Sequence, residues 1–311
     1  MTYAIENQAS TILVIGAGEL GISVLRALRH KAQNTPTRIS VLLRKEAIEA
    51  RSGAKKARLD ELRALGIEWV AGDLQHQSVA ELSALFRPFQ TVINCSGFVG
   101  GPGTQLKITE AILKAGVRRY FPWQFGVDYD VVGMGSGQQV WDEQLAVRQR
   151  LRKQSQTEWL IISTGIFTSY LFEPGFGVVD AEHHRVYGLG SWEYAVTLTT
   201  PEDIGLLTAE VYFHQPRLAN QIVYIAGDTL TYQQLADLMQ AHWGDEVERQ
   251  LLDKEQLLAD VAQYPDDMAA KYRLAFARPD GLAWDKAATY NAQQDIETTS
   301  AQQWLTRHQL R

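Results

Sequence analysis

The feature that most constrains the fold is a set of three glycines near the N-terminus. The sequence TILVIGAGELG at 11–21 places Gly16, Gly18 and Gly21 in a G-x-G-x-x-G spacing, between a short apolar run and an amphipathic pattern. In a strand-turn-helix unit the first glycine permits the tight turn, the second lets the backbone approach a pyrophosphate, and the third permits close helix-strand packing. The motif therefore predicts a dinucleotide site at the start of a helix, where Glu19 and Leu20 contribute backbone N–H groups to bind the phosphates.

Short apolar runs alternate with helical patterns through the first half of the chain. Each run is continuous rather than alternating, as expected for the strands of a parallel sheet that helices cover on both faces. This rhythm predicts an α/β fold with a doubly wound parallel sheet of the Rossmann type. The expected strands are Thr11–Ile15, Ile39–Leu43, Ile67–Val70, Thr91–Cys95, Arg119–Phe121 and Trp159–Ser163.

After the sixth of these runs the regular alternation of strand and helix patterns ends. A stretch rich in glycine and aromatic residues follows. Two helix starts still stand out, because Thr200 and Thr231 are each followed three residues later by a side-chain acceptor, the pattern of a capping box. We therefore expect residues 1–165 to form the dinucleotide-binding domain, and residues 166–311 to form mainly a smaller α/β substrate domain. Within the second region, the segment at about 195–228 is expected to return to the first sheet.

The end of the second expected strand discriminates between the two nicotinamide cofactors. An NAD site carries Asp or Glu there for the ribose hydroxyls, whereas this strand ends in VLLRKE, with Arg44 in the place of the acid and Lys45 beside it. A guanidinium binds a 2′-phosphate through two hydrogen bonds, and a carboxylate would repel it. The sequence thus predicts NADP(H), the alternative being that Arg44 is a solvated strand-end charge. Lys55 and Lys56, taken individually, are interpreted as part of a solvated helix face.

Composition narrows the class of protein further. The 311 residues are 45% hydrophobic and 21% charged, with a formal net charge of −6 and a single cysteine. The acidic balance argues against sequence-independent binding to nucleic acid, and a lone cysteine excludes an intrachain disulfide. The sequence has no apolar run long enough to span a membrane and no signal-peptide pattern at its start. We therefore expect a cytoplasmic protein without a direct nucleic-acid or membrane partner.

Three other segments invite a functional interpretation. DAEHHR at 180–185 groups acidic and imidazole side chains, but adjacent histidines alternate faces on a strand, so we interpret it as a polar turn and predict no metal site. Cys95 ends an apolar run and is interpreted as a small core residue rather than a nucleophile. The glycine-rich segment that follows lies where ligands bind in parallel sheets, so we expect Ser96, Gly97 and Phe98 to border the nicotinamide.

Several motifs together make the chain resemble a known family. They are VIGAGELG, VLLR, VAGDL, TEAILKAGVRRYFPWQFGVD, STGIF, TTPEDIG and IETTSAQQWL. These motifs are similar to those of the NmrA-like, isoflavone-reductase-like proteins, an atypical branch of the short-chain dehydrogenases, and the resemblance covers essentially the whole chain. It implies a Rossmann domain that binds NADP(H), a smaller substrate domain, and a small-molecule substrate in a cleft between the two. On the same basis, Asp73 of VAGDL and Gln124 of PWQFG join the expected cofactor-binding residues.

Two positions depart from the family pattern. The family motif Pro-Ser-Glu-Phe-Gly is PWQFG here, which puts Gln124 in the place of the glutamate. The lysine that serves the reductases as general base or proton donor is replaced by Gln144, and glutamine does not titrate. Asp128 and Tyr129, in the preceding loop, are the other candidates for proton transfer.

Two functions follow from the resemblance. The family includes reductases of isoflavonoids and lignan-type phenylpropanoids, and also regulators that bind a dinucleotide without known turnover. The aromatic-rich second half favours an NADPH-dependent reductase acting on a small apolar or aromatic substrate, provided that these aromatic residues line a cleft rather than a simple core. Gln144 favours the alternative, a redox sensor or regulator that binds NADP(H) and reports its state to a protein partner. We favour the reductase, because most family members with a full substrate domain look like enzymes.

Overall fold

A computed structural model describes residues 10–136 and 139–308 of the chain. Residues 1–9, which carry the expectation that no signal peptide is present, lie outside this description. The described residues form two compact units. The first unit contains the residues up to Trp123, with Ala146–Ile162 and Ile204–Ile222. The second contains Gln124–Leu145, Ser163–Asp203 and the residues from Val223 on.

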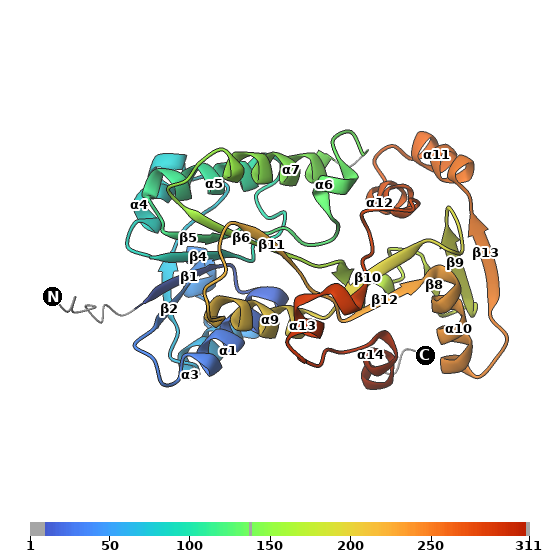
Figure 1. Ribbon diagram of the computed structural model, residues 1–311, viewed down its shortest axis with the longest axis horizontal. Coiled ribbons are helices and arrows are strands. Elements are labelled where there is room, and N and C mark those ends of the chain that lie inside the picture. The colour runs from blue at the N-terminus through green and yellow to red at the C-terminus, as the bar shows by residue number, and fades with distance from the viewer. Residues whose placement is uncertain (1–9, 137–138, 309–311) are drawn as a thin grey trace. The chain divides into compact units, whose positions relative to one another are not determined.

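The first unit is built on a seven-stranded sheet (Figure 1). Its strands are β1 (Thr11–Ile15), β2 (Arg38–Leu43), β3 (Glu68–Ala71), β4 (Thr91–Asn94), β5 (Arg119–Phe121), β6 (Glu158–Ser163) and β11 (Gln221–Tyr224). Their order is β11-β6-β5-β4-β1-β2-β3, and β1 to β6 pair in parallel. The order 3-2-1-4-5-6 is that of a doubly wound dinucleotide-binding sheet. The predicted fold class is confirmed, and the six predicted strands lie within one residue of their expected bounds.

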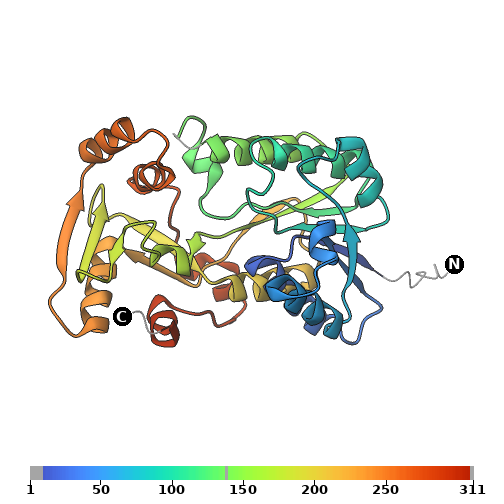
Figure 2. The same ribbon diagram turned by 180° about the vertical axis from the view of Figure 1, so that it is seen from behind.

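Helices cover both faces of this sheet, as Figures 1 and 2 show from opposite sides. On one face lie α4 (Val79–Phe86) and α5 (Thr104–Ala115), and on the other lie α1 (Glu19–Lys31) and α9 (Pro201–Phe213). Apolar side chains of β1, β4 and α5 are consequently buried in one core cluster. This two-sided burial is the physical reason why the strands appear in the sequence as continuous apolar runs. The remaining helical segments of the first unit are α2 (Lys45–Ile48), α3 (Gly53–Ala64) and the part of α7 (Gln139–Arg152) from Ala146 on, whereas α6 (Tyr129–Val132) belongs to the second unit.

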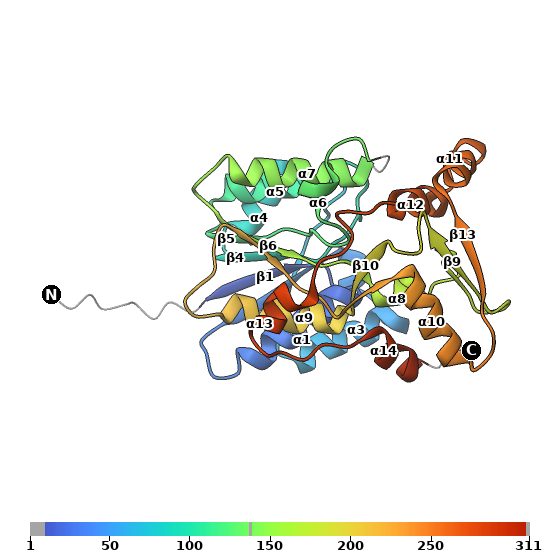
Figure 3. The same cartoon turned by 45° about the vertical axis from the view of Figure 1, so that its right-hand side comes forward.

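The second unit contains two three-stranded sheets, ordered β12-β10-β7 and β13-β9-β8. These strands are β7 (Ile166–Phe167), β8 (Val179–Asp180), β9 (Arg185–Leu189), β10 (Ala195–Thr199), β12 (Asp228–Thr231) and β13 (Glu248–Leu252). The helical segments are α8 (Thr168–Leu171), α10 (Tyr232–Trp243), α11 (Lys254–Gln263), α12 (Met268–Phe276), η1 (Lys286–Ala288), α13 (Tyr290–Gln293) and α14 (Ala301–His308). Figure 3 shows α11 and α12 side by side at one end of this unit. A core rich in aromatic side chains from α8, α10 and α12 holds the unit together.

The predicted helix starts of the second half are present. Thr231 Oγ1 accepts from the backbone N–H of Gln234 at 3.1 Å, and Gln234 Oε1 accepts from the backbone N–H of Thr231 at 2.8 Å, a complete capping box. Thr200 Oγ1 likewise accepts from the N–H of Asp203 at 3.1 Å. The Asp203 carboxylate, however, accepts from the N–H of Thr299 at 2.8 Å, so it also fixes the segment before α14.

The other sequence expectations for the second half have mixed outcomes. Residues 181–184 of DAEHHR form a turn, as predicted, and Asp180 Oδ2 lies 2.9 Å from Nδ1 of His183. Of the segment at 195–228, β11 pairs in the seven-stranded sheet, whereas β10 belongs to a separate sheet. Residues 124–145 group with the second unit. The assignment of a cofactor domain and a substrate domain stays a prediction.

None of the helices in the described part of the chain is long and apolar enough to cross a membrane. Nor does any group of three or more His, Cys, Asp or Glu in this part of the chain have an arrangement that could hold a metal ion.

Candidate functional site

The glycine turn joins β1 to α1 at the carboxyl edge of the seven-stranded sheet. Gly16 has a φ of +93°, where a residue with a side chain would be strained. A Cβ on Gly21 would lie 2.1 Å from the carbonyl oxygen of Gly16, so α1 packs on the turn only because residue 21 has no side chain. Gly18 differs, because no atom of the described residues lies within 4 Å of the place its Cβ would take. The first and third glycines thus serve the fold, while Gly18 faces open space.

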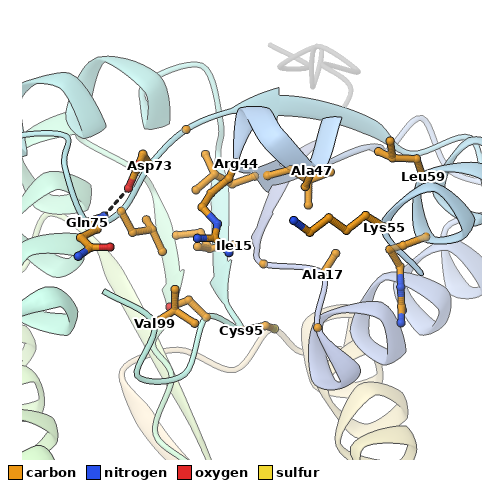
Figure 4. Close-up of a pocket in the computed structure, with 18 of the residues that line it drawn as sticks. Ile15, Ala17, Arg44, Ala47, Lys55, Leu59, Asp73, Gln75, Cys95 and Val99 are labelled. Atoms are coloured by element: carbon orange, nitrogen blue, oxygen red, sulfur yellow. Dashed lines mark hydrogen bonds between the residues drawn. The ribbon is translucent and has the colours of Figure 1, made fainter. Parts of the chain in front are cut away.

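A cavity of about 400 Å³ lies beside this turn (Figure 4). Five of the predicted cofactor-binding residues line it: Gly16, Gly18, Arg44, Asp73 and Ser96. They follow β1, β2, β3 and β4, and parallel strands bring these four connections to one edge of the sheet. The structure therefore brings together, in one cavity, residues that are up to 80 positions apart in the sequence.

The remaining predicted cofactor residues are not among the described residues that line this cavity. Leu20 is buried within α1, and the side chain of Lys45 is 75% exposed, with its amine 3.8 Å from Glu49. Phe98 packs edge to face on Trp123, with ring centroids 4.5 Å apart. The full set outside the lining is Glu19, Leu20, Gly21, Lys45, Gly97, Phe98 and Gln124.

Positively charged side chains from two parts of the chain line this cavity. Arg44 follows β2, and Lys55 and Arg58 lie three residues apart on α3. Figure 4 shows the Lys55 side chain extending from α3 across the cavity toward the side of Arg44. Lys55 is exposed, as its interpretation as a solvated residue predicts, and it also lines the cavity. Arg58 is a lining residue that the sequence motifs did not indicate, although its spacing from Lys55 places both on one helix face.

Asp73 supplies the acidic group of the cavity. Its Oδ2 lies 2.8 Å from Nδ1 of His76, and its Oδ1 accepts from the backbone N–H groups of Gln75 at 2.8 Å and His76 at 3.1 Å. These bonds, above all the one from the His76 side chain, lower the pKa of Asp73 to about 2. The carboxylate is therefore charged at neutral pH, and it keeps lone pairs for a further donor.

Cys95 lies at the end of the apolar run that contains β4 and contributes to the same lining. Its side chain is buried, and burial raises the pKa of the thiol far above its ordinary value. The thiol is therefore protonated at neutral pH and a poor nucleophile. The prediction that Cys95 is a packing residue is consistent with this geometry.

Gln124 and Gln144 form a buried amide pair in the second unit. Gln124 Nε2 donates to Gln144 Oε1 at 2.8 Å and to the backbone carbonyl of Gln144 at 3.1 Å. Both residues are 0% exposed. Gln144 Nε2 is also buried, and among the residues that the structure describes it has no hydrogen-bond partner. The positions that the family motif gives to a glutamate and a lysine thus contact each other directly in this chain.

The two other proton-transfer candidates are buried at the start of α6, where Asp128 is the N-cap and Tyr129 the first helical residue. The hydroxyl of Tyr129 donates to the backbone carbonyl of Phe125 at 2.6 Å. Asp128 Oδ2 accepts from the hydroxyl of Tyr224 at 2.6 Å, and its Oδ1 accepts from the N–H of Asp130 at 3.1 Å. These bonds hold the loop in place, and a role of either residue in proton transfer stays a prediction.

The lining residues fit the phosphates of NADP(H). Gly18 leaves room for a pyrophosphate, and as the N-cap of α1 it offers no side chain that would occupy the first-turn N–H groups. Those groups have no partner within a helix, and they lie at the positive end of the helix dipole. Arg44, Lys55 and Arg58 add the charge that a further phosphate requires.

Known proteins resemble this chain over most of its length. Residues 8–278 match the model of the NmrA-like family. An NmrA-like family domain-containing oxidoreductase of Gibberella moniliformis is 43% identical over 298 residues, which cover 96% of this chain and 97% of that protein.

Solved structures show the same fold. An isoflavone reductase has a TM-score of 0.79 at 22% identity, covering 97% of this chain and 100% of that one. An NADPH-dependent quinone oxidoreductase from Escherichia coli, solved with NADPH, has a TM-score of 0.73 at 19% identity, covering 96% and 99%. At such identities the likeness concerns the fold alone.

Proposed function

Because this chain belongs to the NmrA-like family, we propose that it is an NADPH-dependent reductase of the isoflavone-reductase-like type, acting on a small apolar or aromatic substrate. Family membership confirms the resemblance that the sequence motifs predicted. The similar proteins include an oxidoreductase, an isoflavone reductase and an NADPH-dependent quinone oxidoreductase, and their names support reductive chemistry on a planar compound. The observation that carries the proposal is that the glycine turn and Arg44 line one cavity.

Each part of the cavity has a role in this proposal. The glycine turn and the first-turn N–H groups of α1 hold the pyrophosphate. Arg44 and Lys55 bind the 2′-phosphate, and the Asp73 carboxylate accepts from a donor on the adenosine part. Ser96, after β4, borders the nicotinamide. When bound, NADPH supplies the hydride, and the protein supplies the binding and orientation.

Turnover of a substrate panel tests the proposal. The panel contains an isoflavone, a phenylcoumaran-type benzylic ether and a quinone, and consumption of NADPH is followed by absorbance. At least one compound is expected to give a product two electrons more reduced, identified by mass spectrometry. Gly18→Val serves as the matched control, because it removes cofactor binding and should remove the turnover with it. NADPH bound tightly without reduction of any compound would contradict the reductase.

The buried amide pair favours a second candidate function, a redox sensor or regulator. Neither amide titrates, and both side chains are fully buried, so the pair does not relay a proton in the way a lysine would. A sensor of this kind binds NADPH and NADP+ with different affinities and changes its binding to a protein partner accordingly. The same panel separates the two functions, because a sensor shows cofactor binding without turnover.

The choice of cofactor depends on Arg44 in this proposal. We expect the wild type to bind NADPH at least about tenfold more tightly than NADH, because one charge-assisted bidentate contact contributes about 1.5–3 kcal/mol. Arg44→Ala should lose most of that preference by weakening NADPH alone. Titration calorimetry with both cofactors measures it. Equal affinities in the wild type, or an unchanged preference in Arg44→Ala, would place the selecting group elsewhere.

A further inference from the structure

Arg58 is the cation of the cavity for which the sequence motifs do not account. It follows Lys55 by three residues on α3, so the two side chains leave the same face of the helix, and both line the cavity. Ala54, in the first turn of α3, lines it as well. The helix therefore presents its N-terminal turn and two cations to the same cavity as Arg44.

The Arg58 guanidinium is only partly satisfied by acceptors of the chain itself. Its Nη1 atom is buried, and it has no hydrogen-bond partner within the described residues. Glu61 Oε2 lies 3.8 Å from Nη1, beyond hydrogen-bond distance, and Glu61 Oε1 accepts from Nε of Arg26 at 2.6 Å. A buried N–H group without an acceptor costs free energy. An acceptor from a bound ligand would satisfy this atom.

Two other cations of α3 differ from Arg58 in their ion pairs. Lys56 and Arg63 both form ion pairs with Asp60, on the same helix. Neither of them lines the cavity. Asp60 thus pairs with two cations that are outside the cavity lining, whereas Glu61 pairs closely with Arg26 of α1 and has only a 3.8 Å contact with Arg58.

Within the described residues, the cations that line the cavity have weaker ion pairing than Lys56 and Arg63. Over the residues that the structure describes, Arg44 and Lys55 form no ion pair, and Arg58 has the 3.8 Å contact with Glu61. The acidic residue in the described lining is Asp73, and its carboxylate already pairs with His76. Three cations at one cavity repel each other unless an anion binds among them.

We propose that Arg58 is a third binding residue for the 2′-phosphate of NADPH, together with Arg44 and Lys55. This inference rests on the proposed NADPH-dependent function. A phosphate monoester carries a charge of about −1.5 to −2 near neutral pH and has three strong acceptor oxygens, so a single guanidinium neutralises it only in part. Arg58 donates through its guanidinium, whose Nη1 has no acceptor among the described residues, and thereby contributes to specificity for NADPH over NADH.

Calorimetric titration of Arg58→Met with four ligands tests this assignment. The ligands are NADPH, NADH, 2′,5′-ADP and 5′-AMP, so each pair differs mainly in the 2′-phosphate. Methionine keeps the apolar stem and removes the charge. We expect NADPH and 2′,5′-ADP to bind about tenfold more weakly, while NADH and 5′-AMP stay within about twofold. Arg58→Lys, which keeps the charge but not the planar fork, should fall between the two.

Arg63→Met is the matched control, because it removes the same charge from the same helix at a residue that does not line the cavity. It should leave all four affinities within about twofold. Equal losses in the two variants, or an equal loss of NADPH and NADH in Arg58→Met, would overturn the inference. If Arg58→Met does not fold, as judged by circular dichroism, Arg58→Gln decides by the same criteria. A wild type that binds NADPH and NADH equally would instead contradict the proposed function.

Discussion

Gly18→Val abolishes NADPH binding and leaves the protein folded. No described atom lies within 4 Å of the Cβ position at Gly18, and its φ of −69° suits a residue with a side chain, so valine causes no internal clash. The two γ-carbons would instead occupy the space in which the pyrophosphate approaches the turn. We expect the affinity for NADPH to fall at least about 100-fold, equivalent to ~2.7 kcal/mol. Titration calorimetry measures the affinity, and circular dichroism the fold.

Gly21→Val is the control that separates binding from folding. A Cβ at this position would lie 2.1 Å from the carbonyl oxygen of Gly16, so α1 must move away from β1 to admit it. We expect a loss of more than about 3 kcal/mol in the free energy of unfolding, measured in urea. The phosphate role of Gly18 would be refuted by a folded Gly18→Val variant that binds NADPH as the wild type does.

Gln144→Lys alone destabilises the protein, and Gln124→Glu restores it. The side chain of residue 144 is fully buried, and its acceptor contact is with Nε2 of Gln124, a donor. An ammonium there would face this donor instead of a counter-charge, so we expect a cost of about 3–5 kcal/mol in the free energy of unfolding at neutral pH. A glutamate at 124 supplies that counter-charge at the same contact. The double variant should recover at least about 2 kcal/mol relative to the sum of the single variants.

The stability of the Gln144→Lys variant is expected to depend on pH in one direction. Desolvation lowers the pKa of a buried lysine in the folded state below its ordinary value of about 10.4. At a pH between the lowered pKa of the folded state and the ordinary pKa of the unfolded chain, the lysine is protonated only in the unfolded chain. The free energy of unfolding of Gln144→Lys therefore rises with pH in this range. Urea unfolding at pH 7 and pH 10 measures the difference. The double variant should show less of this recovery at high pH, because its lysine is stabilised in the charged form.

Gln144→Met is the uncharged control for this cycle. It removes the buried Nε2 that has no partner, and it leaves the bond from Gln124 to the backbone carbonyl of residue 144. The loss in the free energy of unfolding should be smaller for Gln144→Met than for Gln144→Lys. Additive effects of Gln124→Glu and Gln144→Lys would show that the two positions do not interact as a pair. Turnover by the double variant, compared with the wild type, then reports whether a lysine at 144 provides proton transfer.

The parts of the structure that the sequence predicts well depend on local pattern. Continuous apolar runs define β1 to β6 because helices cover both faces of the sheet, and the glycine spacing identifies the turn after β1. Counting along the chain from this turn then leads to Arg44 at the end of β2. The shorter strands of the second unit escape such analysis, since β7 and β8 have two residues each and show no periodicity.

The unpredicted parts of the site depend on contacts distant in the sequence. Lys55 and Arg58 line the cavity because of the direction in which α3 leaves the sheet edge, and no local pattern specifies that direction. Their spacing of three residues was the available signal. The contact of Gln124 with Gln144 likewise joins a loop to a helix 20 residues further on. The sequence shows that both positions differ from the family pattern. Only the structure shows that the two side chains are in contact.

The position of α3 has a consequence for how cofactor preference can change. The glycine turn, which we propose binds the pyrophosphate common to both nicotinamide cofactors, is joined to α1 by the close packing of Gly21 on Gly16. The cations on α3 belong to a helix that buries only Leu59 and Leu62. Lys55 and Arg58 are not among these buried residues, so substitutions there are expected to leave the packing of α3 on the sheet largely unchanged. If the proposed roles hold, substitutions at Lys55 and Arg58 are expected to change the preference between the two coenzymes while the glycine turn and the sheet stay as they are.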